Sequence, residues 1–476
     1  MSFAEAILPF VAMLFFFVVG AVAFKTGGST IVVAMLGAAA VASTSVVRLG
    51  AGWSDIERAA GEKFAAVLPV IFILLAIGML IGTWMLSGTI PYLVAYGLRL
   101  VSPDYLVLTA FLATSLMSIA TGTSWGSAGT VGVAMMGMAA ALDAPLPVVA
   151  GAVVSGAYFG DKLSPLSDTT NISAIAVGIP LYRHIRHLLY TSVPAFVIAF
   201  AVYLLVGGAG ATAADKAASL IAEIECVYDL PILAMLPPLV VIAAVIAKTP
   251  PALGIAASSL VAVIIGIFAQ GFSVADAVEA AMRGFDVNMI ASSGADPASA
   301  SAGFAKLVER GGVYSMSETL IVILAAFILA GAMEVSGALD ALVRRLLMIA
   351  RSTFTLIAAA AAAGAMTIAL ISHYGVTALL VGGLFKDAYV KRGLAEENLS
   401  RTLEDGAAII EPVLPWTVSA VYMAGVVGVP TADYAPWALF CYTGALFTLL
   451  LAAAFKWTGF GLKLRREETP TPATAQ

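Results

Sequence analysis

Long apolar runs separated by short polar segments make up most of the chain. Ten runs are long enough to cross about 30 Å of hydrocarbon as helices, at residues 6–24, 30–48, 65–85, 104–121, 188–208, 231–247, 252–269, 317–335, 354–372 and 438–457. Four further segments are short (127–142 and 374–388) or broken by polar residues (148–179 and 403–429). The pattern predicts an all-α polytopic membrane protein with about ten to fourteen spans.

Both broken segments carry the same pattern, about half a chain length apart. The first reads SGAYFGDKLSPLSDTTNISAIAVGIP from Ser155 to Pro180, and the second reads DGAAIIEPVLPWTVSAVYMAGVVGVP from Asp405 to Pro430. In each copy an apolar helix stops at an acidic, proline-containing turn and then resumes. Charge and proline at matched places inside apolar helices indicate discontinuous helices at a transport site between two repeats.

The repeat extends beyond these motifs, because GTWMLSG at 82–88 matches GAMEVSG at 331–337 and TSWG at 123–126 matches SHYG at 372–375. We therefore expect a first transmembrane repeat at 1–210, a linker at 211–230, a second repeat at 231–460 and a cytoplasmic tail at 461–476. A Ser-, Gly- and Ala-rich insertion at about 286–316 is expected to be an exposed loop. The stretch from residue 6 is interpreted as a spanning helix and not as a leader.

Basic residues predict the orientation of the repeats. Five segments rich in Lys and Arg are placed on the cytoplasmic side: Arg48/Arg58/Lys63, Arg183/Arg186, Arg344/Arg345/Arg351, Lys386/Lys391/Arg392 and Lys463/Arg465/Arg466. Their counterparts in the other half are poorer in basic residues, which predicts inverted-topology repeats with both termini in the cytoplasm. We also expect a re-entrant hairpin with its tip at TGTSWGSAG, and interfacial amphipathic helices at 87–101 and 338–351.

Composition supports this class and excludes others. The chain is 61% hydrophobic and 11% charged, whereas soluble domains carry about 25% charged residues, and its mean hydropathy is +1.00. No basic patch suggests nucleic acid, and the two cysteines, Cys226 and Cys441, have no metal-binding spacing. Without a phosphate-binding loop, any transport should be driven by ion gradients across the bilayer, with no cofactor beyond those ions.

The first broken segment concentrates oxygen-bearing side chains between apolar arms. A central Asp or Lys costs about 2.5–3.5 kcal/mol in a membrane helix, so this cluster should face a hydrated cavity. Carboxylate, hydroxyl, amide and carbonyl oxygens suit a hard cation such as Na⁺. The alternative is an ordinary extramembrane loop with hydroxyl caps. The candidate ligands are Asp161, Ser164, Ser167, Asp168, Thr169, Thr170 and Asn171, with Na⁺ at Asp161, Asp168 and Asn171, and with Thr121, Thr123 and Ser124 at the hairpin tip, which could instead be a plain turn.

In the second half the candidate acids are Asp405 and Glu411, with Thr417 beyond them, and Glu404 is either part of the site or a solvated helix end. A buried carboxylate holds a proton more tightly, so competition between Na⁺ and H⁺ for such groups would give antiport. Glu334, which has no basic neighbour in the sequence, is either a gate or an interfacial glutamate. His373 is either a proton relay or a simple hydrogen-bonded turn residue.

These residues resemble a known family. GDKLSPLSDTT at 160–170, TGTSWGSAGTVGVAMMG at 121–137, ERGGVYSM at 309–316 and LEDGAAIIEPVLPW at 403–416 are similar to the NhaC-type Na⁺/H⁺ antiporters. The resemblance implies a prokaryotic cytoplasmic-membrane transporter with inverted repeats and re-entrant hairpins, a cation site at Asp161 and the polar residues 164–171, and contributions from Asp405 and Thr417. Pro415, Trp416 and Thr417 stand where the family is expected to show PWN.

The leading hypothesis is Na⁺/H⁺ antiport by alternating access, in the bilayer and without a nucleic-acid partner. Because the family includes malate/lactate exchangers, the alternative is Na⁺- or H⁺-coupled exchange of a small carboxylate or amino acid, for which Lys162 is the obvious cation. A remote third hypothesis is an intramembrane enzyme using His373, although no nucleophile stands at paired spacing and HExxH is absent. A homodimer is compatible with the sequence.

Overall fold

The computed structural model describes residues 3–20, 27–207, 213–229 and 232–465, and within these ranges the regular elements are helices, with one isolated bridge between Leu394 and Leu464. This confirms the all-α class. The first half contains α1 (Phe3–Val19), α2 (Gly27–Arg48), α3 (Trp53–Leu86), α4 (Thr89–Leu100), η2 (Pro103–Tyr105), α5 (Leu106–Thr121), α6 (Ser124–Ser127), η3 (Ala128–Gly132), α7 (Val133–Ala141), α8 (Leu146–Leu163), α9 (Asp168–Val177) and α10 (Leu181–Val206).

The remaining elements begin with α11 (Ala213–Val227), which fills most of the expected linker. They continue with η4 (Ile232–Met235), α12 (Leu236–Ile246), α13 (Pro251–Phe268), α14 (Val274–Met282), η5 (Val287–Ser293), η6 (Pro297–Ser299), α15 (Ala302–Val308), η7 (Val313–Met316), α16 (Ser317–Val335), α17 (Ala338–Ile349), α18 (Thr353–Ile371), α19 (Tyr374–Lys391), α20 (Glu396–Leu403), η8 (Glu404–Ala408), η9 (Glu411–Val413), α21 (Val418–Val427), α22 (Thr431–Tyr434), η10 (Ala435–Trp437) and α23 (Leu439–Thr458).

Among the described residues, eight helices are long and apolar enough to cross a membrane, or up to ten if each of two bent pairs counts as one span. Eight of the ten predicted runs are therefore found, and two are shorter than expected. The described part of α1 ends at Val19, and residues 21–24 of that run lie outside the described ranges. The run 231–247 forms η4 and α12, which together reach only from Ile232 to Ile246. Pro237 and Pro238 stand in the first turn of α12, where their missing N–H groups are tolerated.

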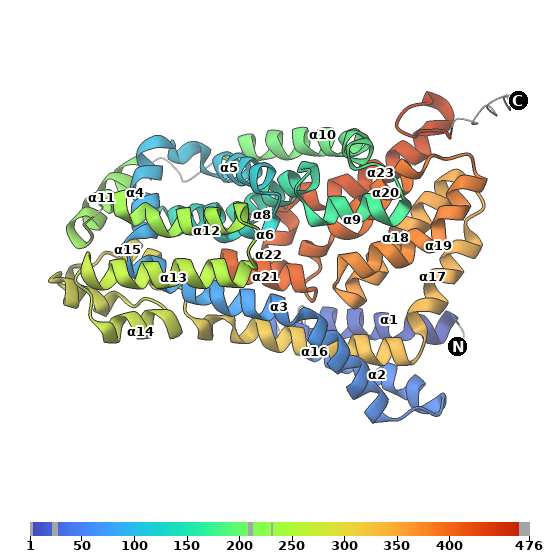
Figure 1. The fold of residues 1–476 in the computed structure, drawn as a ribbon, viewed down its shortest axis with the longest axis horizontal. Helices are drawn as coiled ribbons and strands as arrows, with labels where there is room; N and C mark the ends of the chain where they lie inside the picture. The colour runs from blue at the N-terminus through green and yellow to red at the C-terminus, as the bar shows by residue number, and fades with distance from the viewer. Residues whose placement is uncertain (1–2, 21–26, 208–212, 230–231, 466–476) are drawn as a thin grey trace, which may run out of the picture.

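Helices of the first half of the chain pack directly against helices of the second half. Helix α2 of the first half packs along α16 of the second, and α13 of the second half packs along α3 of the first (Figure 1). Helix α9 likewise packs on α19, and α21 packs on η3. Each half thus contributes helices to the surroundings of the other. The boundaries 1–210 and 231–460 stay a prediction, as do the outer linker residues 211, 212 and 230, which lie outside the described ranges.

The insertion at 286–316 is only in part the exposed loop that the sequence analysis expected, because residues 291–303 are exposed or half-buried and the segment after them packs inside. It folds into three short 3₁₀ segments and α15, and Phe304, Leu307 and Val308 are fully buried. These three side chains follow one another at i, i+3 and i+4, which is the spacing of one helix face. The surrounding Ser, Gly and Ala residues dominate the composition and conceal this short apolar face.

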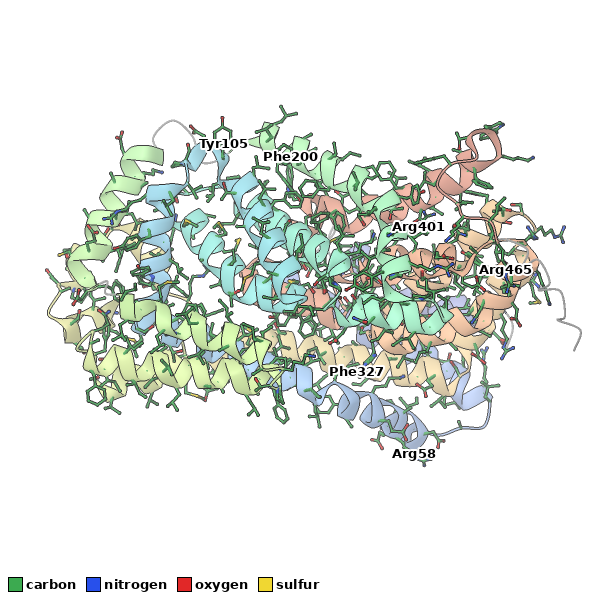
Figure 2. All side chains as sticks on the ribbon, turned by 45° about the horizontal axis from the view of Figure 1, so that its top comes forward. Arg58, Tyr105, Phe200, Phe327, Arg401 and Arg465 are labelled. Atoms are coloured by element: carbon green, nitrogen blue, oxygen red, sulfur yellow. The ribbon has the colours of Figure 1, made fainter. Side chains whose placement is uncertain are left out.

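The two predicted amphipathic helices form as α4 and α17, and α4 packs against α7 and α11, with Arg99 paired to Glu225. In Figure 1 the start of α1 and the end of α23 lie toward the same end of the molecule, and Figure 2 places Arg58 and Arg465 toward that end. Residues 466–476 of the expected cytoplasmic tail lie outside the described ranges.

Candidate functional site

The break between α8 and α9 is held in place by its own polar side chains. Pro165 has no N–H to continue the helix, so α8 ends at Leu163 and α9 begins at Asp168. Ser167 accepts a hydrogen bond from the first turn of α9. The amide nitrogen Nδ2 of Asn171 donates to the carbonyl oxygens of Pro165 (3.1 Å) and Ser167 (2.7 Å). The predicted interruption of the helix is therefore confirmed, and side-chain hydrogen bonds to the backbone hold it in place.

Two more of the predicted ligands also bind the backbone around the break. Ser164 Oγ donates to the carbonyl oxygen of Ile119 at 2.9 Å, and Thr170 Oγ1 donates to that of Lys162 at 3.1 Å. These hydroxyls join the break to α5 and to the end of α8. In this structure the backbone groups around the break therefore have side-chain hydrogen-bond partners, which are Ser164, Ser167, Thr170 and the amide nitrogen of Asn171.

A cavity of about 400 Å³ opens beside the break. Asp161, Asp168 and Thr169 line it from the broken helix. Asp161 is 6% exposed, and its Oδ2 accepts a hydrogen bond from Ser124 Oγ at 2.9 Å. No Lys, Arg or His nitrogen among the described residues lies within 4.0 Å of the Asp161 carboxylate. This carboxylate is therefore buried, faces a cavity and is not neutralised by a cation of the protein.

The opposite wall of the cavity is the predicted hairpin tip, from Thr121 to Gly126. Gly122 has φ of +70° at the end of α5, and a Cβ atom there would lie within 3.0 Å of the Ser167 nitrogen and closer still to Leu166. Only a glycine allows this turn to approach the break so closely. Thr121, Thr123 and Ser124 are consequently brought to the same cavity as Asp161, as the sequence predicted.

An aromatic pair joins this tip to the second half. The rings of Trp125 and Tyr422 stack with centroids 4.1 Å apart, and Tyr422 OH donates to the carbonyl oxygen of Trp125 at 2.8 Å. Tyr422 belongs to α21 and also lines the cavity. The first-half site thus includes a residue of the second broken helix, which sequence reasoning did not identify.

Lys162 and Asp405 form an ion pair with both side chains fully buried. Thr448 Oγ1 donates to Asp405 Oδ2 at 2.7 Å, and the ammonium group of Lys162 lies 3.4 Å from Thr191 Oγ1 and 5.6 Å from the ring centre of Phe440. The pair links the end of α8 to η8 of the other half. Lys162, expected as the cation for a substrate carboxylate, already binds a carboxylate of the protein.

Glu404 is fully buried, so its interpretation as a solvated helix end is wrong. Ser173 donates to one of its oxygens, Tyr374 OH lies 3.2 Å from Oε2 and Thr169 Oγ1 lies 3.3 Å from Oε1. The Nε2 atom of His184 lies 3.8 Å from Oε2 and has no hydrogen-bond partner. Glu404 therefore meets the cavity residue Thr169 on one side and a histidine of α10 on the other.

Glu411 is 6% exposed and lies beside Ser419 and Tyr158. Thr417 caps α21, and its Oγ1 also donates to the carbonyl oxygen of Glu411 at 2.6 Å. Asp161 and Glu411 are both inside the protein and not at distant surfaces. The second break thus resembles the first in using a hydroxyl residue to begin its second arm.

The two remaining candidates lie apart from these contacts. Glu334 has no basic neighbour in the sequence, but in the structure it forms an ion pair with Lys63 of α3. The expectation that it lacks a basic partner is therefore wrong. The glutamate side chain is 56% exposed. His373 is exposed and caps α19 through Nδ1, which accepts from the Val376 nitrogen at 3.4 Å.

Sequence reasoning missed the partners of the buried charges, which lie far along the chain. A lysine inside an apolar helix requires an acidic partner or a hydrated cavity, so the sequence alone indicates that Lys162 has one of the two. Its identity as Asp405, 243 positions away, depends on how the helices pack. His184 and Tyr374 carried no such indication, because each is a common residue at a helix end.

Comparisons with known proteins agree with this arrangement. The sequence model of the Na⁺/H⁺ antiporter family matches residues 156–457, which include both broken helices. An uncharacterized Na⁺/H⁺ antiporter of Haemophilus influenzae is 42% identical over 94% of this chain and 95% of its own length. The Na⁺/H⁺ antiporter NhaC of Alkalihalophilus pseudofirmus is 35% identical over 87% of each chain, and a malate-2H⁺/Na⁺-lactate antiporter of Bacillus subtilis is 32% identical over 86% of this chain and 87% of its own. This chain therefore belongs to the Na⁺/H⁺ antiporter family.

Proposed function

We propose that the protein exchanges Na⁺ for H⁺ across the membrane at the first broken helix. The observation that supports this most strongly is the Asp161 carboxylate, which is buried against a cavity without a neighbouring cation. Such a group must bind either a proton or a metal cation to be neutral inside the bilayer. When Na⁺ binds the carboxylate, the proton leaves, and when a proton returns, Na⁺ is released.

The proposed Na⁺ ligands are oxygen atoms around the cavity. Asp161 and Asp168 supply carboxylates, and Thr121, Thr123, Ser124 and Thr169 supply hydroxyls. Hard cations favour such oxygen ligands. Asn171 does not line the cavity in this structure, so its amide oxygen would join the site only after the break changes its conformation. Backbone carbonyl groups of the unwound segment can complete the site.

In this proposal the second-half acids couple the cation site to protons. Glu404 reaches the cavity residue Thr169, and Glu411 lies near the start of α21, whose Tyr422 forms part of the cavity wall. Asp405 acts with them through its link to Lys162. Glu334 and His373 keep the roles of gate and relay only as hypotheses, since their observed contacts are with Lys63 and with the helix that His373 caps.

Alternating access would follow from two inverted repeats that move against each other. The reciprocal packing of α2 on α16 and of α13 on α3 supports such a pair of repeats. We place the protein in the prokaryotic cytoplasmic membrane with both termini in the cytoplasm, because Arg58 and Arg465, which belong to two of the basic segments, lie toward the end where α1 starts and α23 ends (Figure 2). An intramembrane enzyme is set aside, since the chain belongs to a family of antiporters.

The test is transport by the purified full chain in proteoliposomes carrying a pH-sensitive dye. An imposed Na⁺ gradient should move protons in the opposite direction, and a K⁺ gradient of equal size should not. The same vesicles should be tested with malate, lactate and amino acids, alone and with Na⁺. If Na⁺ moved no protons in any of these conditions, the proposed exchange would be wrong.

A further inference from the structure

A second cavity, also of about 400 Å³, lies on the other face of α21. Tyr422 faces the first cavity, whereas Val421 and Gly425 line the second. The second cavity is further bounded by η7 and α16, through Ser315 and Thr319, and by Arg310. It shares none of the acids of the proposed cation site.

Arg310 is fixed at this cavity by a tight stretch of backbone. Gly311 and Gly312, which follow it, have φ of +87° and +83°, and the Gly312 nitrogen donates to the Gly78 carbonyl oxygen of α3 at 2.7 Å. The carbonyl oxygen of Arg310 accepts from the Phe285 nitrogen at 3.1 Å. Residues other than glycine rarely adopt such positive φ values. The segment therefore sets the position of the arginine, which projects from a packed backbone and not from a free loop.

The guanidinium group of Arg310 is only partly satisfied by the protein. Its Nη2 lies 3.4 Å from the Val427 carbonyl oxygen in the last turn of α21, and 2.9 Å from where a Cβ atom on Gly428 would be. Its Nη1 is buried without a hydrogen-bond partner. Among the described residues, no Asp or Glu oxygen lies within 4.0 Å of it. A buried charged nitrogen without an acceptor is costly, and capping of α21 uses only one of the five guanidinium donors.

We propose that this second cavity binds a small organic carboxylate, whose oxygens accept hydrogen bonds from Arg310. The fork of an arginine matches the two oxygens of a carboxylate. The walls formed by Val421, Val426 and Val429 suit a short carbon chain, and Ser315 and Thr319 offer hydroxyls. A cavity of this volume lies within the usual range of about 300–1,000 Å³ for small-molecule sites. The proposal goes beyond Na⁺/H⁺ exchange and does not rest on it.

The assignment moves the role of the substrate-binding cation from Lys162 to Arg310. Lys162 is fully buried and Arg310 is partly buried, and both lie near a broken helix. Lys162 is paired with Asp405, whereas Arg310 is paired with no acid among the described residues. An amino acid is included in the proposed class, because Glu318 lies on the same cavity and can accept from an ammonium group. The carboxylate is the common feature of all these ligands.

Binding should be measured by calorimetry on the full chain in nanodiscs of zwitterionic lipid, with L-lactate, L-malate and L-arginine as probes and chloride as the comparison anion. Wild-type protein should bind at least one of the three carboxylates saturably. Arg310→Gln should weaken that binding by at least about tenfold, with Arg310→Lys in between, because a lysine keeps the charge and loses the fork. Arg283→Gln is the matched control, since Arg283 is 71% exposed and pairs with Glu279 on its own helix. It should bind as the wild type does.

A second variant separates ligand binding from helix capping. Thr319→Leu fills the cavity and leaves Arg310 and the end of α21 unchanged, so it should abolish binding while the melting temperature stays near that of the wild type. If no carboxylate binds the wild type, or if Arg310→Gln binds as tightly, the proposal is overturned and Arg310 only caps α21. Binding of anionic lipid alone, lost in Arg310→Gln, would also overturn it in favour of a lipid headgroup site. The failure of Na⁺/H⁺ exchange would not affect these readouts.

Discussion

The two broken helices share one sequence pattern but hold their acids differently. At the break between α8 and α9, Asp161 faces a cavity and has no cationic partner among the described residues. At the break before α21, Asp405 is bound to Lys162, and Glu404 is bound by Ser173 and Tyr374. Glu411, which matches Asp161, is buried and has no ion pair among the described residues. Each half therefore has one buried acid without an ion pair among the described residues, and the second half adds two acids that are held by neighbouring side chains.

The Asp405 ion pair exists only because the first half contributes a lysine to the contact between the two halves. The first half places Lys162 directly after Asp161, and this lysine points to the second half and neutralises Asp405. The second half has no lysine at the matching place, where Pro412 follows Glu411. As a result, Asp405 is neutralised by a lysine of the first half, while Asp161 and Glu411 have no ion pair among the described residues. The Lys162–Asp405 pair thus joins the two halves.

Breaking that pair should have the largest effect on stability. Lys162→Met leaves Asp405 buried without a cation, and removal of one partner of a buried pair costs about 3–5 kcal/mol. The double variant Lys162→Met with Asp405→Asn removes both charges and should recover much of that loss. Thermal unfolding in detergent micelles, followed by tryptophan fluorescence, checks both variants. A double variant no more stable than the single one would show that the pair is not the cause.

Glu411→Gln tests whether a second-half acid takes part in exchange. Glutamine resembles the protonated side chain at every pH, so exchange should become less dependent on pH. We expect Na⁺-driven proton movement to fall by about tenfold at alkaline pH and by less at acid pH. The measurement is dye-reported exchange in proteoliposomes between pH 6 and 9, with Glu279→Gln, an exposed acid that lines neither cavity, as the control. A wild-type profile would make Glu411 structural.

Tyr422→Phe should have a smaller effect. It removes the hydrogen bond from Tyr422 OH to the Trp125 carbonyl oxygen and keeps the stacked rings. The loss of one such bond costs about 0.5–1.5 kcal/mol, so the melting temperature should fall slightly and exchange should slow severalfold. Tyr442→Phe, whose hydroxyl donates to the Pro436 carbonyl oxygen at the surface, is the matched control. Equal exchange rates in both variants would mean that the Tyr422 hydrogen bond has no role in exchange.

The smallest effect is expected at an exposed acid. Hydrogen bonds from Lys306 and Lys216 lower the pKa of Asp143 to about 2. Because the folded pKa lies below the ordinary value, the stabilisation is complete above about pH 4 and is lost as the pH falls toward 2. Surface pairs are worth about 0–1 kcal/mol, so Asp143→Asn should melt slightly below the wild type at pH 6 and together with it at pH 2. A constant difference across this range would mean that the carboxylate charge is not responsible.

Much of the fold could be predicted because local sequence determines it. Eight spans follow from apolar length, and the break at Pro165 follows from a missing N–H beside polar residues. A turn also forms where glycines and hydroxyls gather, at Gly122 and Ser124, and the re-entrant hairpin around it stays a prediction. These features depend on a few neighbouring residues, and the interactions that decide them act within one or two helical turns.

The remaining features depend on packing between distant segments. Lys63 meets Glu334 across two helices, and Arg310 enters a cavity because two glycines lie against α3. Phe304 is buried although its segment is mostly Ser, Gly and Ala. Neither composition nor a repeat can specify which side chain of one segment meets which of another. The sequence therefore predicted both breaks but not the partners of their charges, and the assignment of the cation site to these breaks stays a prediction.

The central claim is that Asp161 is the carboxylate that exchanges Na⁺ for H⁺. The most direct measurement compares Asp161→Asn with Asp143→Asn, an exposed acid outside the cavity, in proteoliposomes under one imposed Na⁺ gradient. We predict that Asp161→Asn reconstitutes as a folded protein and moves protons at least about a hundredfold more slowly than the wild type, while Asp143→Asn matches the wild type. Wild-type exchange by folded Asp161→Asn would contradict the proposed mechanism.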